Sequence, residues 1–105
     1  MSSNKTNYFA SKLAKAFLKG NIIAPIPKRF SKKLINANNF RKLCESKIKK
    51  PIIGFKAGGT AIPVLKKLKE KEPFYASVFK QNFLKNNKPV KHNKYILGIE
   101  LEVCY

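Results

Sequence analysis

The stretch Ile52-Ile53-Gly54-Phe55-Lys56-Ala57-Gly58-Gly59-Thr60 marks the point where the sequence changes from helical to strand-like character. The residues before the glycine pair are mostly apolar and predict a short buried strand, which the glycines then break. Thr60 is able to cap a helix that continues through Lys69, and Pro63 falls in its first turn, where a missing backbone N–H costs little. The second half of the chain is therefore expected to open with a strand followed by a helix.

Two further segments have strand character. Pro73 marks a turn before Phe74-Tyr75-Ala76-Ser77-Val78-Phe79, which is rich in aromatic residues. The chain ends in Tyr95-Ile96-Leu97-Gly98-Ile99-Glu100-Leu101-Glu102-Val103-Cys104-Tyr105, an apolar run that contains Glu100 and Glu102. Because side chains alternate along a strand, both glutamates would project from one face, with their Cα atoms about 6.5 to 7 Å apart. They could bind one Mg²⁺ or Mn²⁺, or be solvated charges on an edge strand whose apolar residues point inward.

The first half of the sequence predicts two amphipathic helices. The first has apolar residues at three- and four-residue spacing and stops at Gly20. Ser31 is a plausible N-cap for the second. The apolar positions are Phe9, Ala10, Leu13, Ala14, Phe17 and Leu18 in the first helix, and Leu34, Ala37, Phe40, Leu43, Cys44 and Ile48 in the second. We therefore expect one α+β structural unit, with a helical region at 1–50 and the start of a β-rich region at 51–105.

The charge of the chain is extreme but unusual in kind. The 105 residues carry a formal net charge of +18, yet of 23 basic residues only Arg29 and Arg41 are arginine. Arginine is preferred for bidentate contact with phosphates and bases, so the lysines are better explained as solvated surface, without a specific nucleic-acid partner. The rival interpretation is a small lysine-rich nucleic-acid-binding protein in which aromatic residues such as Tyr75 stack on bases.

No targeting or membrane segment is predicted. The N-terminus has no apolar core of signal-peptide length, and no apolar run approaches the ~20 residues of a spanning helix, so a cytoplasmic location without membrane contact is expected. Cys44, Cys104 and His92 supply too few soft ligands for a structural zinc site.

Lys56 lies where an apolar strand meets a glycine pair, and strand ends followed by tight turns often deliver polar groups into pockets. A lysine partly removed from water can hold a substrate carboxylate or transfer protons. The alternative is one more surface lysine.

Three segments together resemble a known family: Gly54-Phe55-Lys56-Ala57-Gly58-Gly59-Thr60, Glu72-Pro73-Phe74-Tyr75 and Ile99-Glu100-Leu101-Glu102. In this order and spacing they resemble the 2-keto-4-pentenoate hydratase and oxalocrotonate decarboxylase family, within the fumarylacetoacetate hydrolase superfamily. Leu13 through Pro25 also resembles that family's N-terminal helix and the turn after it. The resemblance spans nearly the whole chain and corresponds to the N-terminal part of a full-length member.

The resemblance implies N-terminal helices followed by the beginning of a mixed β-sheet of the fumarylacetoacetate hydrolase-like fold, incomplete here. It implies a metal-dependent hydratase or decarboxylase of unsaturated 2-oxo acids such as 2-hydroxypenta-2,4-dienoate, which belong to aromatic catabolism. Glu100 and Glu102 match the acidic ligands of the family's E-x-E motif, with Mg²⁺ or Mn²⁺ as the metal. Lys56 matches the lysine of the glycine-rich strand, implying a catalytic role in binding the substrate acid group or in proton transfer, and Gly58 and Thr60 fall in the same substrate-binding segment.

The chain also departs from the family pattern. A third acidic metal ligand is expected beyond Tyr105, and Phe74 and Ala76 stand where several members carry an acid and a glycine. We therefore expect a truncated or fragmentary member that holds its metal weakly and is inactive alone. Homo-oligomers, pairing with the missing C-terminal portion, or a noncatalytic role beside a complete homologue are the arrangements that this implies.

Overall fold

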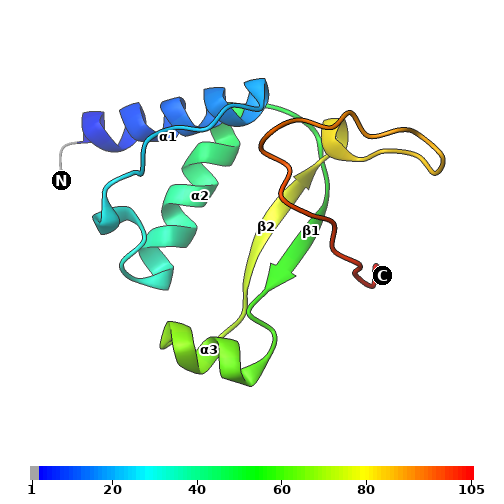
Figure 1. Ribbon diagram of the computed structural model, residues 1–105. Helices are drawn as coiled ribbons and strands as arrows, with labels where there is room; N and C mark the ends of the chain where they lie inside the picture. Colours follow the sequence, from blue (N-terminus) through cyan, green and yellow to red (C-terminus); the bar gives the residue numbers. More distant parts are fainter. Residues whose placement is uncertain (1–2) are drawn as a thin grey trace.

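The computed structural model describes residues 3–105 and has an α+β architecture (Figure 1). Two long helices lie together on one side of a two-stranded antiparallel sheet, and a short helix forms part of the connection between the two strands. The regular elements are α1 (Ser3–Lys19), α2 (Leu34–Ile48), β1 (Ile52–Gly58), α3 (Ile62–Leu68) and β2 (Phe74–Phe79), with 3₁₀ turns at Lys28–Phe30 and Lys80–Asn82.

The core lies between α1 and α2, as the amphipathic pattern predicts. Ala10 is fully buried, and this small side chain lets α1 approach its neighbours closely. Phe30 and Phe40 stack with ring centroids 4.6 Å apart, which anchors the first 3₁₀ turn against α2. Gly20, at φ +65°, ends α1, because a left-handed residue costs glycine little and lets Asn21 N–H donate to Ala16 C=O at 2.9 Å.

The second helix starts differently from the prediction. Lys33, in an extended conformation, precedes α2 without a side-chain cap, whereas Ser31 Oγ donates to the Lys28 carbonyl at 3.4 Å. The reason is the 3₁₀ turn at Lys28–Phe30, which uses Ser31 as its own C-terminal residue before the helix begins.

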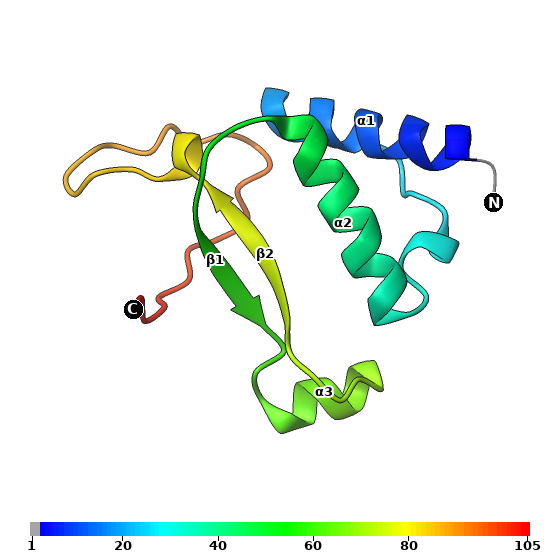
Figure 2. The same cartoon turned by 180° about the vertical axis from the view of Figure 1, so that it is seen from behind.

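The hairpin pairs β1 with β2, and Lys56 lies opposite Ala76. Both strands were predicted, but the expectation that β1 is buried is wrong: Phe55, for example, is 67% exposed. The two views in Figures 1 and 2 show why, since α2 lies on the β2 side of the hairpin and, among the described residues, no helix covers β1. Phe79 at the end of β2 is the strand residue that packs into the helices, against Ala14 and Ile48.

Helix α3 is shorter than predicted. Ala61 rather than Thr60 precedes it, again without a side-chain cap, while Pro63 lies in the first turn as expected. Lys69 ends the helix in a left-handed conformation, and its N–H donates to the carbonyls of Leu65 and Lys66.

The predicted last strand does not form. Residues 95–105 are irregular, and the apolar side chains expected to point inward are exposed, with Leu101 at 103% and Ile99 at 99% of full exposure. A strand needs a neighbour for its backbone N–H and C=O groups, and this segment forms no ladder with any described residue, so the sheet stays two-stranded and antiparallel rather than mixed. Within residues 3–105, no helix is both long enough and apolar enough to span a bilayer.

Candidate functional site

Lys56 contacts both glutamates of the C-terminal segment. Its Nζ lies 2.6 Å from Glu102 Oε1 and 3.7 Å from Glu100 Oε2. The lysine comes from β1, whereas the acids lie on the irregular segment beside the β1 side of the hairpin (Figures 1 and 2). The sequence-derived expectation that these three residues lie within side-chain reach is therefore met, although a loop rather than a neighbouring strand brings the acids there.

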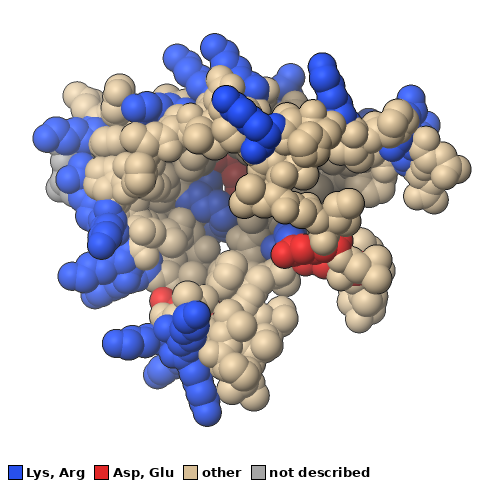
Figure 3. Space-filling view, viewed as in Figure 1, with Lys and Arg blue, Asp and Glu red and all other residues tan. Residues whose placement is uncertain are grey.

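The Lys56 contact is at the surface. The three side chains retain about half or more of their exposure: 52% for Lys56, 79% for Glu100 and 48% for Glu102. In Figure 3 the largest acidic patch on the visible face lies at the C-terminal segment, whereas basic side chains are spread over much of the rest of that face. The hydrogen bond to Glu102 raises the pKa of Lys56 above its ordinary value, and the charge of Glu100 adds to this effect.

The two carboxylates suit a divalent cation in chemistry but not in number. Carboxylate oxygens are the ligands that Mg²⁺ and Mn²⁺ prefer, and Mg²⁺ takes an octahedral shell. Among residues 3–105, no three His, Cys, Asp or Glu side chains come together in an arrangement able to hold a metal. Glu100 and Glu102 would therefore supply part of a shell, and in this structure Lys56 provides their counter-charge.

Gly58 and Thr60 play no part in the contacts of Lys56 that the structure describes. Gly58 has a packing reason instead, because a Cβ at this position would lie 2.6 Å from Cε2 of Phe74. Thr60 is exposed between β1 and α3. Their predicted role in substrate binding stays a prediction.

A second polar cluster was not predicted. Arg41 Nη1 on α2 lies 2.8 Å from both carboxylate oxygens of Glu45, and Ser77 N–H on β2 donates to Glu45 Oε1 at 3.2 Å. The Arg41 guanidinium also lies over the Tyr75 ring, with Cζ 4.4 Å from the centroid. This Arg41 cluster joins α2 to the outer edge of β2. One feature of the sequence could have indicated this cluster: Arg41 is four residues after Ala37 and so lies on the apolar face of the helix.

The Arg41 cluster is more enclosed than the Lys56 contact. The side chains of Arg41 and Glu45 are 18% and 15% exposed. Burial alone would raise the pKa of Glu45, but hydrogen bonds from Arg41 and Ser77 outweigh it and hold that pKa below its ordinary value. Arg41 likewise keeps a raised pKa, because Glu45 outweighs the loss of solvent. The pair is therefore charged on both sides throughout the neutral range.

Two cavities adjoin the Arg41 cluster. One, of about 330 Å³, is lined mostly by apolar side chains of α1, α2, β2 and the connection between the two helices, with Arg41 and Glu45 at its wall. The other, of about 490 Å³, lies between the start of α2 and the α3–β2 connection, and Arg41 lines it as well. Arg41 is thus the charged residue that borders both.

Comparison with known proteins brings no further constraint. No protein-family model, curated protein or solved structure matches this chain. Its function is therefore inferred from its own residues and their geometry.

Proposed function

We propose that this chain carries part of the active site of a metal-dependent hydratase or decarboxylase of unsaturated 2-oxo acids, within the N-terminal part of a fumarylacetoacetate hydrolase-like fold in the cytoplasm. The observation that supports it is the contact of Lys56 with Glu100 and Glu102. Lys56 and Glu102 are 46 residues apart in sequence, yet their side chains meet at 2.6 Å. These are the residues that the resemblance assigns to substrate and metal.

Each residue has a role that its chemistry fits. Glu100 and Glu102 would hold Mg²⁺ or Mn²⁺, which when bound supplies electrophilic stabilisation of the negative charge that develops on a 2-oxo acid. The Lys56 ammonium, beside those carboxylates, is placed to bind the acid group of the substrate or to transfer a proton. The remaining metal ligands would come from a C-terminal portion or from a partner chain, which also leaves room for a noncatalytic role beside a complete homologue.

The proposal is tested by metal affinity with and without a homologous C-terminal segment. Calorimetry with Mn²⁺ should show weak binding to the 105-residue chain and tighter binding when a homologous C-terminal segment is fused or co-expressed. Glu100→Gln or Glu102→Gln should abolish the gain, since loss of one charged ligand typically costs several kcal/mol. Glu70→Gln, in the connection between α3 and β2 and outside the segments that carry the resemblance, should not.

Activity provides the second readout. The completed protein should consume 2-hydroxypenta-2,4-dienoate in an ultraviolet assay, and Lys56→Met should reduce turnover more than metal affinity. Efficient turnover by the bare chain would contradict the need for completion. Unchanged Mn²⁺ affinity in the glutamine variants of the completed protein would remove the metal assignment.

The net charge of +18 favours the second candidate, a nucleic-acid-binding protein. The proposal of an enzyme predicts only counterion-driven binding to generic duplex DNA, which should vanish as salt rises from about 50 to 200 mM. Structure- or sequence-specific nanomolar binding that survives at about 200 mM salt would favour the nucleic-acid candidate instead.

A further inference from the structure

The outer face of helix α1 carries a row of lysines. Lys5, Lys12, Lys15 and Lys19 are all exposed, and within residues 3–105 none of them forms a salt bridge. Tyr8, which is 60% exposed, lies in the same row. We infer that this α1 lysine row binds the phosphate backbone of a single-stranded nucleic acid without reading its base sequence.

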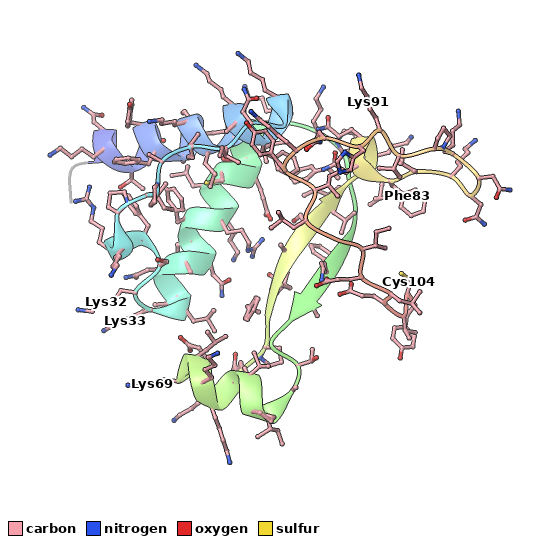
Figure 4. All side chains as sticks on the ribbon, in the orientation of Figure 1. Lys32, Lys33, Lys69, Phe83, Lys91 and Cys104 are labelled. Carbon is pink, nitrogen blue, oxygen red and sulfur yellow. The ribbon has the colours of Figure 1, made fainter. Side chains whose placement is uncertain are left out.

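The row follows from the period of the helix. At about 100° per residue, the four lysines and Tyr8 fall within an arc of about 80° on one side of α1. With a rise of about 1.5 Å per residue, the row from Lys5 to Lys19 is about 21 Å long, enough to follow several nucleotides. In Figure 4, side chains tipped with nitrogen rise from α1 on the side away from α2. The lysines therefore form one linear surface.

The charge along this surface has one sign. Helix α1 contains no Asp or Glu, and Glu45 is the first acidic residue of the whole chain. In Figure 3, basic side chains project along the upper edge of the view, where α1 lies. Lysine binds phosphate as a point charge, and each phosphate that it neutralises releases condensed counterions, which drives association. A row of unpaired lysines therefore suits a row of phosphates.

The opposite face of α1 decides between a nucleic acid and a membrane. A helix that lies in a membrane interface buries its apolar face in lipid. In α1 that face is already in the core, since Ala14 is buried and the Phe17 ring lies 5.3 Å from that of Phe79. Phe17 and Leu18 each keep 40% of their exposure, so little of this face is free to enter lipid. An exposed ring such as Tyr8 can instead stack on an unpaired base, which favours a single strand.

The α1 lysine row is separate from the Lys56 contact. Lys56 projects from β1 toward the C-terminal segment, whereas the row lies on the side of α1 away from α2. Binding of a nucleic acid at the row does not depend on a metal at Glu100 and Glu102. The inference therefore stands or falls independently of the hydratase proposal.

The test compares two triple variants that have the same net charge. Three substitutions make each one: Lys12→Gln, Lys15→Gln and Lys19→Gln in the row variant, and Lys66→Gln, Lys67→Gln and Lys71→Gln in the control. The control lysines are exposed in and after α3. Fluorescence anisotropy follows binding to a labelled uridine oligonucleotide of about 20 residues as salt rises from about 50 to 200 mM, and circular dichroism verifies the fold of both variants.

The salt dependence gives the expected result. Each phosphate neutralised on a single strand contributes about −0.7 to the slope of log K against log salt, so the four lysines predict a slope of about −3. The row variant should reduce the size of that slope by about 2 and weaken binding about tenfold or more at about 50 mM salt, whereas the control should keep the slope of the natural chain. Equal losses in the two variants, or no binding at about 50 mM salt, would overturn the inference.

Two further measurements identify the partner. Tyr8→Leu should weaken binding to the oligonucleotide about fivefold or more and leave binding to a duplex of the same length unchanged, because stacking needs an unpaired base. Equal effects on the two, or no effect, would overturn the assignment to a single strand. The row variant and the control should bind phosphatidylserine vesicles alike. A loss of vesicle binding confined to the row variant, with oligonucleotide binding unchanged, would assign the row to a membrane instead.

Discussion

Replacing Glu45 with glutamine tests whether the Arg41 cluster holds α2 against β2. Glu45 interacts with Arg41 Nη1 through both oxygens and accepts a hydrogen bond from Ser77 N–H, and its side chain is only 15% exposed. Glutamine keeps one acceptor oxygen but loses the charge. Hydrogen bonds to charged groups contribute about 1.5–3 kcal/mol, and exposed ion pairs less than about 1 kcal/mol, so for this partly enclosed pair we expect Glu45→Gln to lower the free energy of unfolding by about 2 kcal/mol.

The same contact predicts a pH dependence. The pKa of Glu45 is lower in the folded chain than its ordinary value of 4.5, because Arg41 and Ser77 donate to the charged carboxylate more strongly than burial disfavours it. The unfolded chain therefore binds the proton first as the pH falls. The stabilisation by Glu45 is complete above that ordinary value and is lost as the pH falls through the lower, folded pKa. The Glu45→Gln variant should lack this part of the acid loss.

The measurement is urea unfolding followed by circular dichroism at several pH values. Glu72→Gln is the matched control, since Glu72 is exposed after α3, and it should change stability by less than about 0.5 kcal/mol. A double-mutant cycle with Arg41→Met isolates the pair term. If Glu45→Gln and Glu72→Gln have the same stability at neutral pH, or the cycle shows no coupling, the cluster does not hold the helix to the hairpin.

Two further predictions concern cysteine reactivity and a glycine. Burial, with a smaller contribution from Glu45, raises the pKa of Cys44 to about 11, so only about one molecule in a thousand carries the Cys44 thiolate at pH 8. Cys104 is exposed. Ellman's reagent should therefore modify Cys104 rapidly in the native chain and Cys44 only in denaturant. Rapid modification of two thiols in the native chain would contradict the burial. Gly59→Ala should lower the free energy of unfolding by about 1–2 kcal/mol, because Gly59 has φ +65° and a Cβ there would lie 2.7 Å from the Phe74 ring. Gly54→Ala is the control, since a Cβ at Gly54 would meet no atom within 4 Å. Equal stability of the two variants would show that the turn adapts.

Hydrophobic period and glycine placement predicted the elements that local pattern determines. The apolar spacing of α1, its stop at Gly20 and the full extent of β2 at Phe74–Phe79 all agree with the structure. These features depend on residues close in sequence. The antiparallel pairing of β1 with β2, by contrast, depends on contacts between strands that are separated in sequence by α3. The sequence pattern predicts the two strands but not their pairing.

The helix starts could not be predicted from residue type alone. Ser31 and Thr60 are good capping residues, yet the helices begin after Lys33 and Ala61. A hydroxyl caps only where the backbone brings an unsatisfied N–H toward it, and a 3₁₀ turn or a proline in the first turn changes that geometry. The Arg41 cluster was missed for a related reason. Its acceptor for Ser77 comes from a helix 32 residues earlier, a distance over which periodicity gives no information.

The C-terminal segment shows how a pattern can predict a shared face without predicting the element. The alternation of Glu100 and Glu102 with apolar residues predicts a strand, and no strand forms. Strand pairing is a property of two segments, and a single sequence pattern specifies only one of them. The shared side of the two acids requires less. Both carboxylates reach the single ammonium of Lys56, so a spacing of two residues brought them to one side of the backbone even without a partner strand. A third strand on the β1 side would fix that arrangement, because it would supply ladder hydrogen bonds, which residues 95–105 do not form in this structure, and cover their exposed apolar side chains.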